Sequence, residues 1–375
     1  MKNLKLYGIL VVEFLSLFFS RRIGMIMFNL LFILFVFSCK KDDPPLPPES
    51  PGAYENGILV LNEGLFQQNN SSISFYNLAN QQVYTQCFLT ENNRGLGDTG
   101  NDFEKYNLNG KDYVIIAVDI SSQIEIVEAN TLKSVAQIPL FDGTNAREPR
   151  RIEVYGMKAF VCNFDGTVSV IDLISNSVVK TITVGANPDG MVQVANKLYV
   201  SNSGGLNYPV YDSTITIIDM NTNNIIENFE TRINSSSMIV DSQNEIYLLS
   251  SGNYADINPA LVRINTTTNQ VDQLFDIPIG SMTKVGDWIY YYNLDSKKVM
   301  RINLITENLD ATIILDCADY ETFSGLQYNA ELNLLFCFDA NGYVNSTTVR
   351  CYATSGVFQY EFMAELNSKK IICNE

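Results

Sequence analysis

The chain has 375 residues, with 25 basic and 41 acidic side chains and a formal net charge of −16. Such an acidic surface repels phosphate backbones, which argues against nucleic acid as a partner. Histidine is absent altogether, which excludes Ser-His-Asp and Cys-His catalysis and also histidine-ligated metals or haem.

The first 38 residues read as a targeting signal rather than as part of a fold. Two apolar runs, 7–19 and 23–37, flank a pair of arginines, and the second run ends just before Cys39. A basic segment, an apolar run and a small residue before cysteine are typical of a bacterial lipoprotein signal peptide, residues 1–38 here. We therefore expect cleavage before Cys39 and lipidation of that residue, with the lipid as the only membrane contact. One or two transmembrane helices are the alternative, although both runs are short for spanning a bilayer.

Residues 39–54 are expected to form an extended tether. The segment Lys40-Lys-Asp-Asp-Pro-Pro-Leu-Pro-Pro48 is charged and rich in proline, so it cannot pack into a core. From residue 39 onward the chain carries 21 basic and 40 acidic side chains, a net charge of −19. The remaining residues, 55–375, are expected to form one domain.

Seven copies of a short strand pattern run through residues 55–375. Most copies read apolar, any residue, two apolar residues and then Asp or Asn, at 73–77, 124–128, 168–172, 215–219, 261–265, 298–303 and 349–353. Their mean spacing is 46 residues. Repeats of about 40 to 50 residues built from short strands are typical of a β-propeller, so the sequence predicts seven blades.

A second series of strands precedes the first and stays in phase with it. These strands are rich in β-branched and aromatic residues and cover 57–62, 113–117, 158–163, 197–202, 245–250, 288–293 and 334–338. Turn sequences such as Asn109-Gly110 precede several of them, and these residues accept the positive φ of tight hairpins. Helical periodicity is absent beyond residue 38. The expected fold class is all-β, a seven-bladed β-propeller of four-stranded blades.

The C-terminal segment is expected to close the ring. The first repeat lacks an innermost strand, whereas the last repeat ends near Phe362 and leaves Lys369-Lys-Ile-Ile-Cys373 over. We predict that this segment pairs beside Gly57–Leu61 in the first blade, which removes two exposed sheet edges; a frayed tail is the alternative. No CxxC or metal-binding spacing is present, so no metal site and no cofactor are expected. A disulfide between Cys337 and Cys351 stays open.

One face of such a propeller is the predicted binding surface. The loops that enter the innermost strands share it with the loops that join the second strand to the third, and the latter are long at 63–71, 203–212, 251–259 and 339–347. Long loops gathered on one face are typical of binding. Aromatic rings would stack on a large polar ligand, and amides and arginines would bond to it; ordinary solvated loops are the alternative. The expected ligand-binding residues are Phe66, Arg147, Arg150, Asn187, Asn202, Tyr208, Tyr211 and Tyr254.

The repeat is similar to that of a known group of propellers. Asn187-Pro-Asp-Gly-Met191, followed by Lys197-Leu-Tyr-Val-Ser-Asn202 and Ile215-Thr-Ile-Ile-Asp219, resembles the YVTN-type, YncE-like repeat. Leu59-Val-Leu-Asn-Glu-Gly64 and Leu96-Gly-Asp98 resemble the propeller lipoproteins of Bacteroidota that include surface cobalamin-capturing proteins. The resemblance covers about residues 55–365, and blades six and seven depart from the pattern.

That resemblance implies a cell-surface lipoprotein of the outer membrane. It would bind a small molecule, such as a corrinoid, and pass it to a TonB-dependent transporter. Two alternatives stay open, a structural or adhesive propeller that binds protein or glycan, and a lactonase-like or glycan-cleaving enzyme. The sequence marks out no pair of carboxylates as catalytic, so we expect binding without catalysis.

Overall fold

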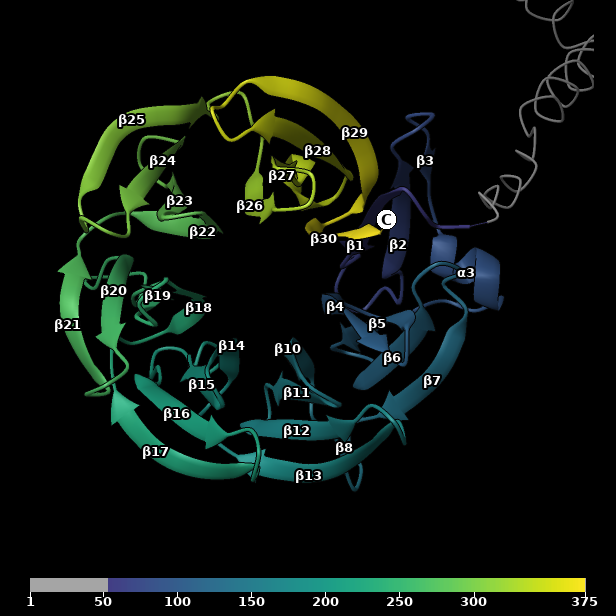
Figure 1. Cartoon of the computed structure of the whole chain (residues 1–375), viewed down its shortest axis with the longest axis horizontal. Helices are drawn as coiled ribbons and strands as arrows, with labels where there is room; N and C mark the ends of the chain where they lie inside the picture. Colours follow the sequence, from purple (N-terminus) through teal and green to yellow (C-terminus); the bar gives the residue numbers. More distant parts are fainter. Residues whose placement is uncertain (1–52, 375) are drawn as a thin grey trace, which may run out of the picture. The chain divides into compact units, whose positions relative to one another are not determined.

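The computed structural model describes residues 53–374, which form a closed ring of seven four-stranded antiparallel sheets (Figure 1). The seven-bladed propeller predicted from the repeat spacing is confirmed. The predicted signal peptide, Cys39 and most of the predicted tether lie outside the described residues. Within residues 53–374, no helix has the length and apolar character needed to cross a membrane.

Each blade runs from an innermost strand at the centre of the ring to an outermost strand at its rim (Figure 1). Blade 1 consists of β30 (Ser368–Asn374), β1 (Gly57–Asn62), β2 (Ser72–Asn77) and β3 (Val83–Tyr84). Blade 2 consists of β4 (Gly100–Leu108), β5 (Lys111–Val118), β6 (Gln123–Glu128) and β7 (Ser134–Pro139). Blade 3 consists of β10 (Pro149–Tyr155), β11 (Lys158–Asn163), β12 (Thr167–Asp172) and β13 (Ser177–Thr183).

The other four blades repeat this order from centre to rim. Blade 4 consists of β14 (Pro188–Val194), β15 (Lys197–Asn202), β16 (Thr214–Asp219) and β17 (Asn224–Glu230). Blade 5 consists of β18 (Ser235–Val240), β19 (Ile246–Ser250), β20 (Ala260–Asn265) and β21 (Gln270–Phe275). Blade 6 consists of β22 (Ile279–Val285), β23 (Trp288–Asn293), β24 (Lys298–Asn303) and β25 (Leu309–Asp316). Blade 7 consists of β26 (Phe323–Asn329), β27 (Leu334–Asp339), β28 (Ser346–Ala353) and β29 (Phe358–Leu366).

The second and third strands of each blade read as apolar runs because both of their faces are buried between neighbouring blades. All six positions of β1 are buried, as are Ile215 to Ile218 in β16. The outermost strands differ, and β17 is exposed at nearly every position. Seven hydrophobic clusters fill the spaces between blades, one for each pair of neighbours.

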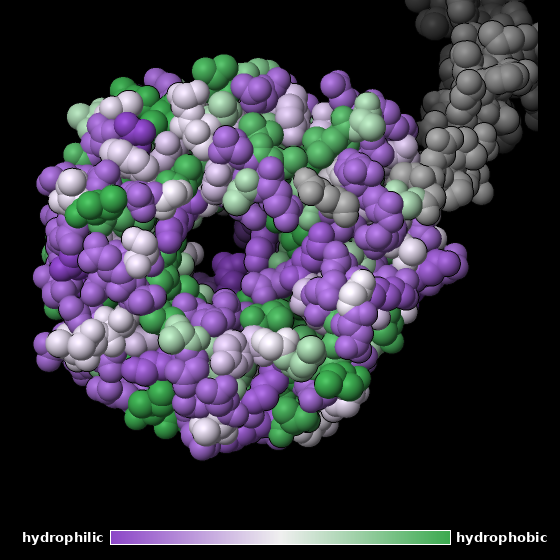
Figure 2. All heavy atoms as spheres, viewed as in Figure 1, coloured by the Kyte–Doolittle hydropathy of each residue, from purple (hydrophilic) through white to green (hydrophobic). Residues whose placement is uncertain are grey.

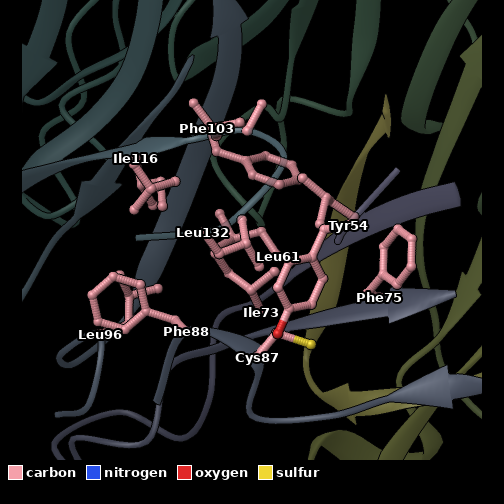
Figure 3. Close-up of a cluster of buried hydrophobic side chains, with 14 of the residues drawn as sticks. Tyr54, Leu61, Ile73, Phe75, Cys87, Phe88, Leu96, Phe103, Ile116 and Leu132 are labelled. Carbon is pink, nitrogen blue, oxygen red and sulfur yellow. The ribbon is translucent and has the colours of Figure 1, made fainter. Parts of the chain in front are cut away.

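Figure 3 shows the cluster between blades 1 and 2, where side chains from β1, β2, β4, β5 and helix α3 (Cys87–Asn92) converge. Tyr54 is 1% exposed, and its ring packs edge-on against Phe75 with the centroids 5.4 Å apart. All seven clusters are built from residues of the ring itself. The ring therefore has its own core, as an independently folding domain requires.

Closure of the ring by the C-terminal segment, as predicted, is confirmed. β30 pairs antiparallel with β1, from Gly57 opposite Asn374 to Leu61 opposite Lys370. Ile371 is 1% exposed and packs into the cluster between blades 7 and 1. The last strand of the chain is therefore the innermost strand of its first blade.

Four short elements were not expected from the sequence, a helix, the two strands of a hairpin and a 3-10 turn. Helix α3 follows the two-residue strand β3, and it buries Cys87 and Phe88 where other blades place a longer outermost strand. At six residues it is too short to show helical periodicity. A small hairpin, β8 (Phe141–Asp142) with β9 (Asn145–Ala146), precedes blade 3, and a 3-10 turn, η1 (Asn341–Tyr343), lies between β27 and β28.

The disulfide left open between Cys337 and Cys351 is not formed. Cys337 lies opposite Arg350, and Cys351 lies opposite Phe336, so the two cysteines are one register step apart. Because successive side chains of a strand point to opposite faces of the sheet, the two thiols face away from each other. They belong to the clusters on either side of blade 7.

Candidate functional site

One face of the ring carries both sets of loops that were expected to share a side. In every blade, the residue after the second strand donates its backbone N–H to the carbonyl of the residue just before the innermost strand. The donor and acceptor pairs are Glu63 and Asn367, Asp119 and Thr99, Phe164 and Glu148, Ser203 and Asn187, Ser251 and Asn234, Leu294 and Pro278, and Ala340 and Thr322. We call this side the upper face and the opposite side the lower face.

Each innermost strand carries a β-bulge at the upper face. There the pairing register shifts by one residue, which leaves an unpaired position on the innermost strand. These bulge positions are Lys369, Asn101, Arg150, Asp189, the Ser236–Ser237 pair, Gly280 and Ser324. A bulge redirects the local side chains, and all of these residues line the upper part of the central channel.

The channel along the axis of the ring has two chambers. The upper chamber has a volume of about 530 Å³ and the lower chamber a volume of about 560 Å³. Four side chains line both chambers and so mark their junction, namely Glu104, Glu153, Gln327 and Lys370. Figure 2 shows the opening at the centre of the ring, with hydrophilic residues along much of its rim.

One side of the upper chamber is charged. Arg150 donates from Nε to the Asp189 carboxylate at 2.7 Å and from Nη1 to the side-chain oxygen of Asn101 at 2.6 Å. Its guanidinium also lies 5.1 Å from the ring centre of Phe164. Arg151 donates to the backbone carbonyls of Asp189 and Asn101, each at 3.3 Å. Burial alone would raise the pKa of the Asp189 carboxyl, but the two guanidinium groups lower it, so the carboxylate stays ionised between them.

The junction of the chambers holds two carboxyl groups with raised pKa values. Burial raises the pKa of Glu104 to about 8 and that of Glu153 to about 7, although nearby Lys370 opposes both shifts. The Lys370 ammonium lies 2.5 Å from the Asp102 carboxylate. Glu104 accepts a hydrogen bond from the backbone N–H of Val154 at 3.0 Å, which ties β4 to β10. Both glutamates therefore titrate near neutral pH.

The opposite side of the upper chamber carries small or uncharged side chains. β18, β22 and β26 supply most of it, and none of their described residues in the lining is charged. The smallest of these residues are Ser236, Ser237, Gly280, Ser281, Thr283, Ser324 and Gly325. The chamber is therefore a polar cavity with its charge confined to blades 1 to 4.

Three predicted stacking residues form an aromatic cluster on the upper face. The ring of Tyr211 lies edge-on to those of Tyr208 and Tyr254, with centroids 6.3 and 6.4 Å apart. Tyr208 and Tyr254 are 73% and 77% exposed. The loop that carries Tyr208 and Tyr211 is held by Asp212, whose carboxylate accepts backbone N–H bonds from the loop before β14 and from β16. Tyr208 and Tyr211 therefore project from a fixed loop, and Tyr254 meets them from the loop between β19 and β20.

Comparison with known proteins identifies the family. The model of the family described as "Domain of unknown function (DUF5074)" matches residues 56–362. The chain belongs to the DUF5074 family. Among curated proteins no sequence matches the chain.

Solved structures similar to this DUF5074 ring are themselves diverse in function. A quinoprotein alcohol dehydrogenase-like protein from Bacteroides thetaiotaomicron is 15% identical, with 87% of this chain and 80% of that chain covered and a TM-score of 0.64. A putative 6-phosphogluconolactonase from Bacteroides uniformis is 10% identical, with 85% and 99% covered and a TM-score of 0.57. Hydrazine synthase from Kuenenia stuttgartiensis is 16% identical, with 64% and 73% covered and a TM-score of 0.53. At such identities the likeness shows the fold alone.

Two of the predicted ligand contacts serve the DUF5074 fold. Asn202 is fully buried and donates its amide to the hydroxyls of Thr214 and Thr216, at 3.0 and 3.1 Å. It has no surface to offer a ligand, so its predicted role is corrected. Asn187 is 8% exposed, and its side chain is engaged by the backbone of Phe164 and Leu206. It therefore fixes the loop that carries Tyr208, and its contact with a ligand stays a prediction.

The remaining predicted residues are spread over the upper loops. Phe66 is 64% exposed on the loop between β1 and β2. Arg147 forms an ion pair with Asp165 at 2.7 Å. Arg150 alone among the predicted residues lines the upper chamber.

The sequence prediction missed most of the chamber in this DUF5074 ring. The charged residues that it missed, Asp102, Glu104, Glu153, Lys369 and Lys370, lie on innermost strands. Their position in the repeat could have identified many of them, because each innermost strand has its β-bulge within its first residues and the side chains there line the channel. Among residues 53–374, no group of three or more side chains is placed to hold a metal ion.

Proposed function

We propose that this propeller is an outer-membrane lipoprotein, exposed at the cell surface, that captures a small polar molecule on its upper face and passes it to a TonB-dependent transporter. The observation that carries the proposal is the cluster of Tyr208, Tyr211 and Tyr254, two of whose rings are 73% and 77% exposed. Aromatic rings on fixed loops offer stacking faces at a low cost in conformational entropy. A ligand stacked there could extend its polar groups toward the channel, which opens on the same face.

The point where the chain enters the ring fits such an anchored arrangement. Tyr54 donates its backbone N–H at 2.8 Å to the carbonyl of Asn130, in the turn between β6 and β7 on the lower face. A tether from Cys39 to this point has about 14 residues and reaches at most roughly 50 Å. A lipid on Cys39 would therefore be connected to the ring at its lower face.

A corrinoid is the first ligand to test. The reason is the resemblance of the repeat sequences to those of the cobalamin-capturing propellers. A corrinoid is also large, flat, rich in amides and phosphorylated, and these properties suit exposed tyrosines beside a polar, cationic cavity.

Calorimetric titration of residues 48–375 with cobalamin tests the proposal. Tyr208→Ala and Tyr254→Ala should each weaken binding at least tenfold, because truncating a stacking aromatic at a binding centre costs about 2 kcal/mol or more. Neither change should lower the melting temperature much, since both rings are exposed. Phe358→Ala is the matched control, because Phe358 is 52% exposed on the outermost strand of blade 7. Equal binding by the tyrosine variants and the control would contradict the site.

The same titration separates the other two functions. An adhesive propeller would bind a protein or a glycan and ignore cobalamin. A lactonase-like enzyme would consume its ligand, so the ligand is recovered after incubation and compared by chromatography. We expect unchanged ligand, and formation of a product would overturn the assignment as a binding protein.

A further inference from the structure

Two arginines of the upper chamber carry more hydrogen-bond donors than the ring uses. A guanidinium has five N–H donors. Within the described residues, Arg150 donates through Nε and Nη1, and Arg151 donates through the same two nitrogens. Both side chains line the chamber, and they are 21% and 33% exposed. Their remaining donors are therefore available to a bound molecule.

Both guanidinium groups are held in place before any ligand arrives. Arg150 is fixed on three sides, by Asp189, Asn101 and the ring of Phe164. Arg151 is fixed by two backbone carbonyls and lies 3.9 Å from the carboxylate of Asp189. Two arginines thus share one aspartate at ion-pair distance, and the carboxylates of Glu63 and Asp119 also lie near enough to act on Arg150. Fixed donors lose little entropy on binding, which favours affinity.

The chamber is also more positive than the rest of the chain. Its lining contains four cationic side chains, Arg150, Arg151, Lys369 and Lys370, and four acidic ones, Asp102, Glu104, Glu153 and Asp189. Two of the acids have raised pKa values, about 8 for Glu104 and about 7 for Glu153, so near neutral pH they are largely or partly protonated. The lining alone then carries a net positive charge, within a chain whose formal net charge is −16. One of its cations, Lys369, is paired at 2.6 Å with Glu63, which lies just outside the lining.

We propose that the upper chamber binds an oxyanion, a carboxylate or a phosphate group, through Arg150 and Arg151. Planar guanidinium groups match both kinds of oxyanion, since two N–H donors can bond to two oxygens at once. This deepens the proposed function, on which it rests, because the oxyanion is the part of the captured molecule that enters the channel. The hydroxyl groups of Ser236, Ser281 and Ser324 line the facing wall and suit further polar groups of that molecule.

Titration of residues 48–375 with inorganic phosphate and with citrate, at constant ionic strength in sodium chloride, tests the site. Arg151→Gln is the decisive variant, because it leaves Asp189 paired with Arg150 and so spares the ion pair within the ring. Lys133→Gln is the matched control, because it removes the same charge from an exposed turn on the lower face. Melting curves of both variants establish that they fold.

We expect Arg151→Gln to weaken binding of the preferred anion about tenfold or more, since hydrogen bonds to charged groups are among the strong ones. Lys133→Gln should bind as the wild type does. The ratio of phosphate to citrate affinity identifies which oxyanion the chamber prefers. Equal binding by the two variants, or no saturable binding of either anion, would overturn the inference.

The tyrosine variants separate this inference from the proposed function. Tyr208→Ala should leave phosphate and citrate binding unchanged, because Tyr208 does not line the chamber. If the anions bind through Arg151 but no ligand depends on Tyr208, the chamber site stands and the capture site fails. If cobalamin binding depends on Tyr208 and neither anion depends on Arg151, the capture site stands and the oxyanion site fails.

Discussion

Replacing Ile371 by alanine should weaken closure of the ring without changing its backbone pairing. Ile371 lies in the middle of β30, is 1% exposed and packs between blades 7 and 1. Its backbone N–H and carbonyl both bond to the side chain of Gln327, at 2.8 and 2.9 Å, and these bonds survive the substitution. The loss is therefore that of a buried side chain, which costs roughly 2–5 kcal/mol. That is a large share of the roughly 5–15 kcal/mol that stabilises a typical domain.

Thermal unfolding followed by circular dichroism measures the effect. A loss of this size corresponds to a fall in melting temperature of roughly 3–7 °C, since an unfolding entropy of about 2.1 cal/mol/K per residue gives about 1.5 °C for each kcal/mol in a ring of this length. Val357→Ala is the control, because Val357 is 60% exposed in the turn before β29 and surface changes of this kind usually cost within about 0.5 kcal/mol. Deletion of residues 369–375 should abolish a cooperative transition or cause aggregation, since it exposes the edge of β1. A melting temperature that is unchanged in Ile371→Ala, or equally lowered in Val357→Ala, would refute closure as a main source of stability.

Three other changes test the anchor, the chamber and the corrected residue. Cys39→Ala should release the protein from the membrane fraction, and continued membrane retention would contradict lipidation at that residue. Glu104→Gln should raise the melting temperature at about pH 8.5 and have little effect near pH 5. The pKa of Glu104 is about 8 in the folded protein and 4.5 ordinarily, so between these values the folded protein binds more protons than the unfolded chain. The Glu104 carboxyl therefore lowers the stability of the wild type as pH rises through that window. Glutamine keeps the acceptor for Val154, and an effect at pH 5 as large as that at higher pH would show that titration is not its cause. Asn202→Ala should lower the free energy of unfolding by about 1 kcal/mol for each of its two hydrogen bonds. The folded variant should bind ligand as the wild type does. Weaker ligand binding at unchanged stability would show that Asn202 contacts the ligand.

The blade strands could be predicted because burial on both faces leaves a strong sequence pattern. Strands β11, β15 and β23 begin and end at the residues predicted for them. Closure could be predicted because the first repeat lacked an innermost strand and an extra strand followed the last repeat. Helix α3 could not, since six residues with two buried side chains fit a strand as well as a helix.

The site was harder to predict than the fold because equivalent positions in different blades carry different residue types. The bulge positions hold Lys, Asn, Arg, Asp, Ser and Gly, and only strand pairing shows that they are equivalent. Loop length together with aromatic content located the tyrosine cluster. The sequence reasoning also placed Asn202 in the site, although Asn163 makes the same pair of bonds with Thr167 and Ser169 in blade 3. An asparagine repeated with hydroxyl residues at the start of the next strand is a structural signature of the blade.

Closure by β30 also sets the order of events in folding. Asn62 and Ser368, which hydrogen-bond at the edge where β1 meets β30, are 306 positions apart in the sequence. A ribosome makes β1 long before β30, so the inner edge of β1 stays unpaired until residues 368–374 have been synthesised. Contacts between such distant residues form slowly because the chain between them must first be ordered. The ring therefore stays open at the inner edge of blade 1 until β30 pairs there.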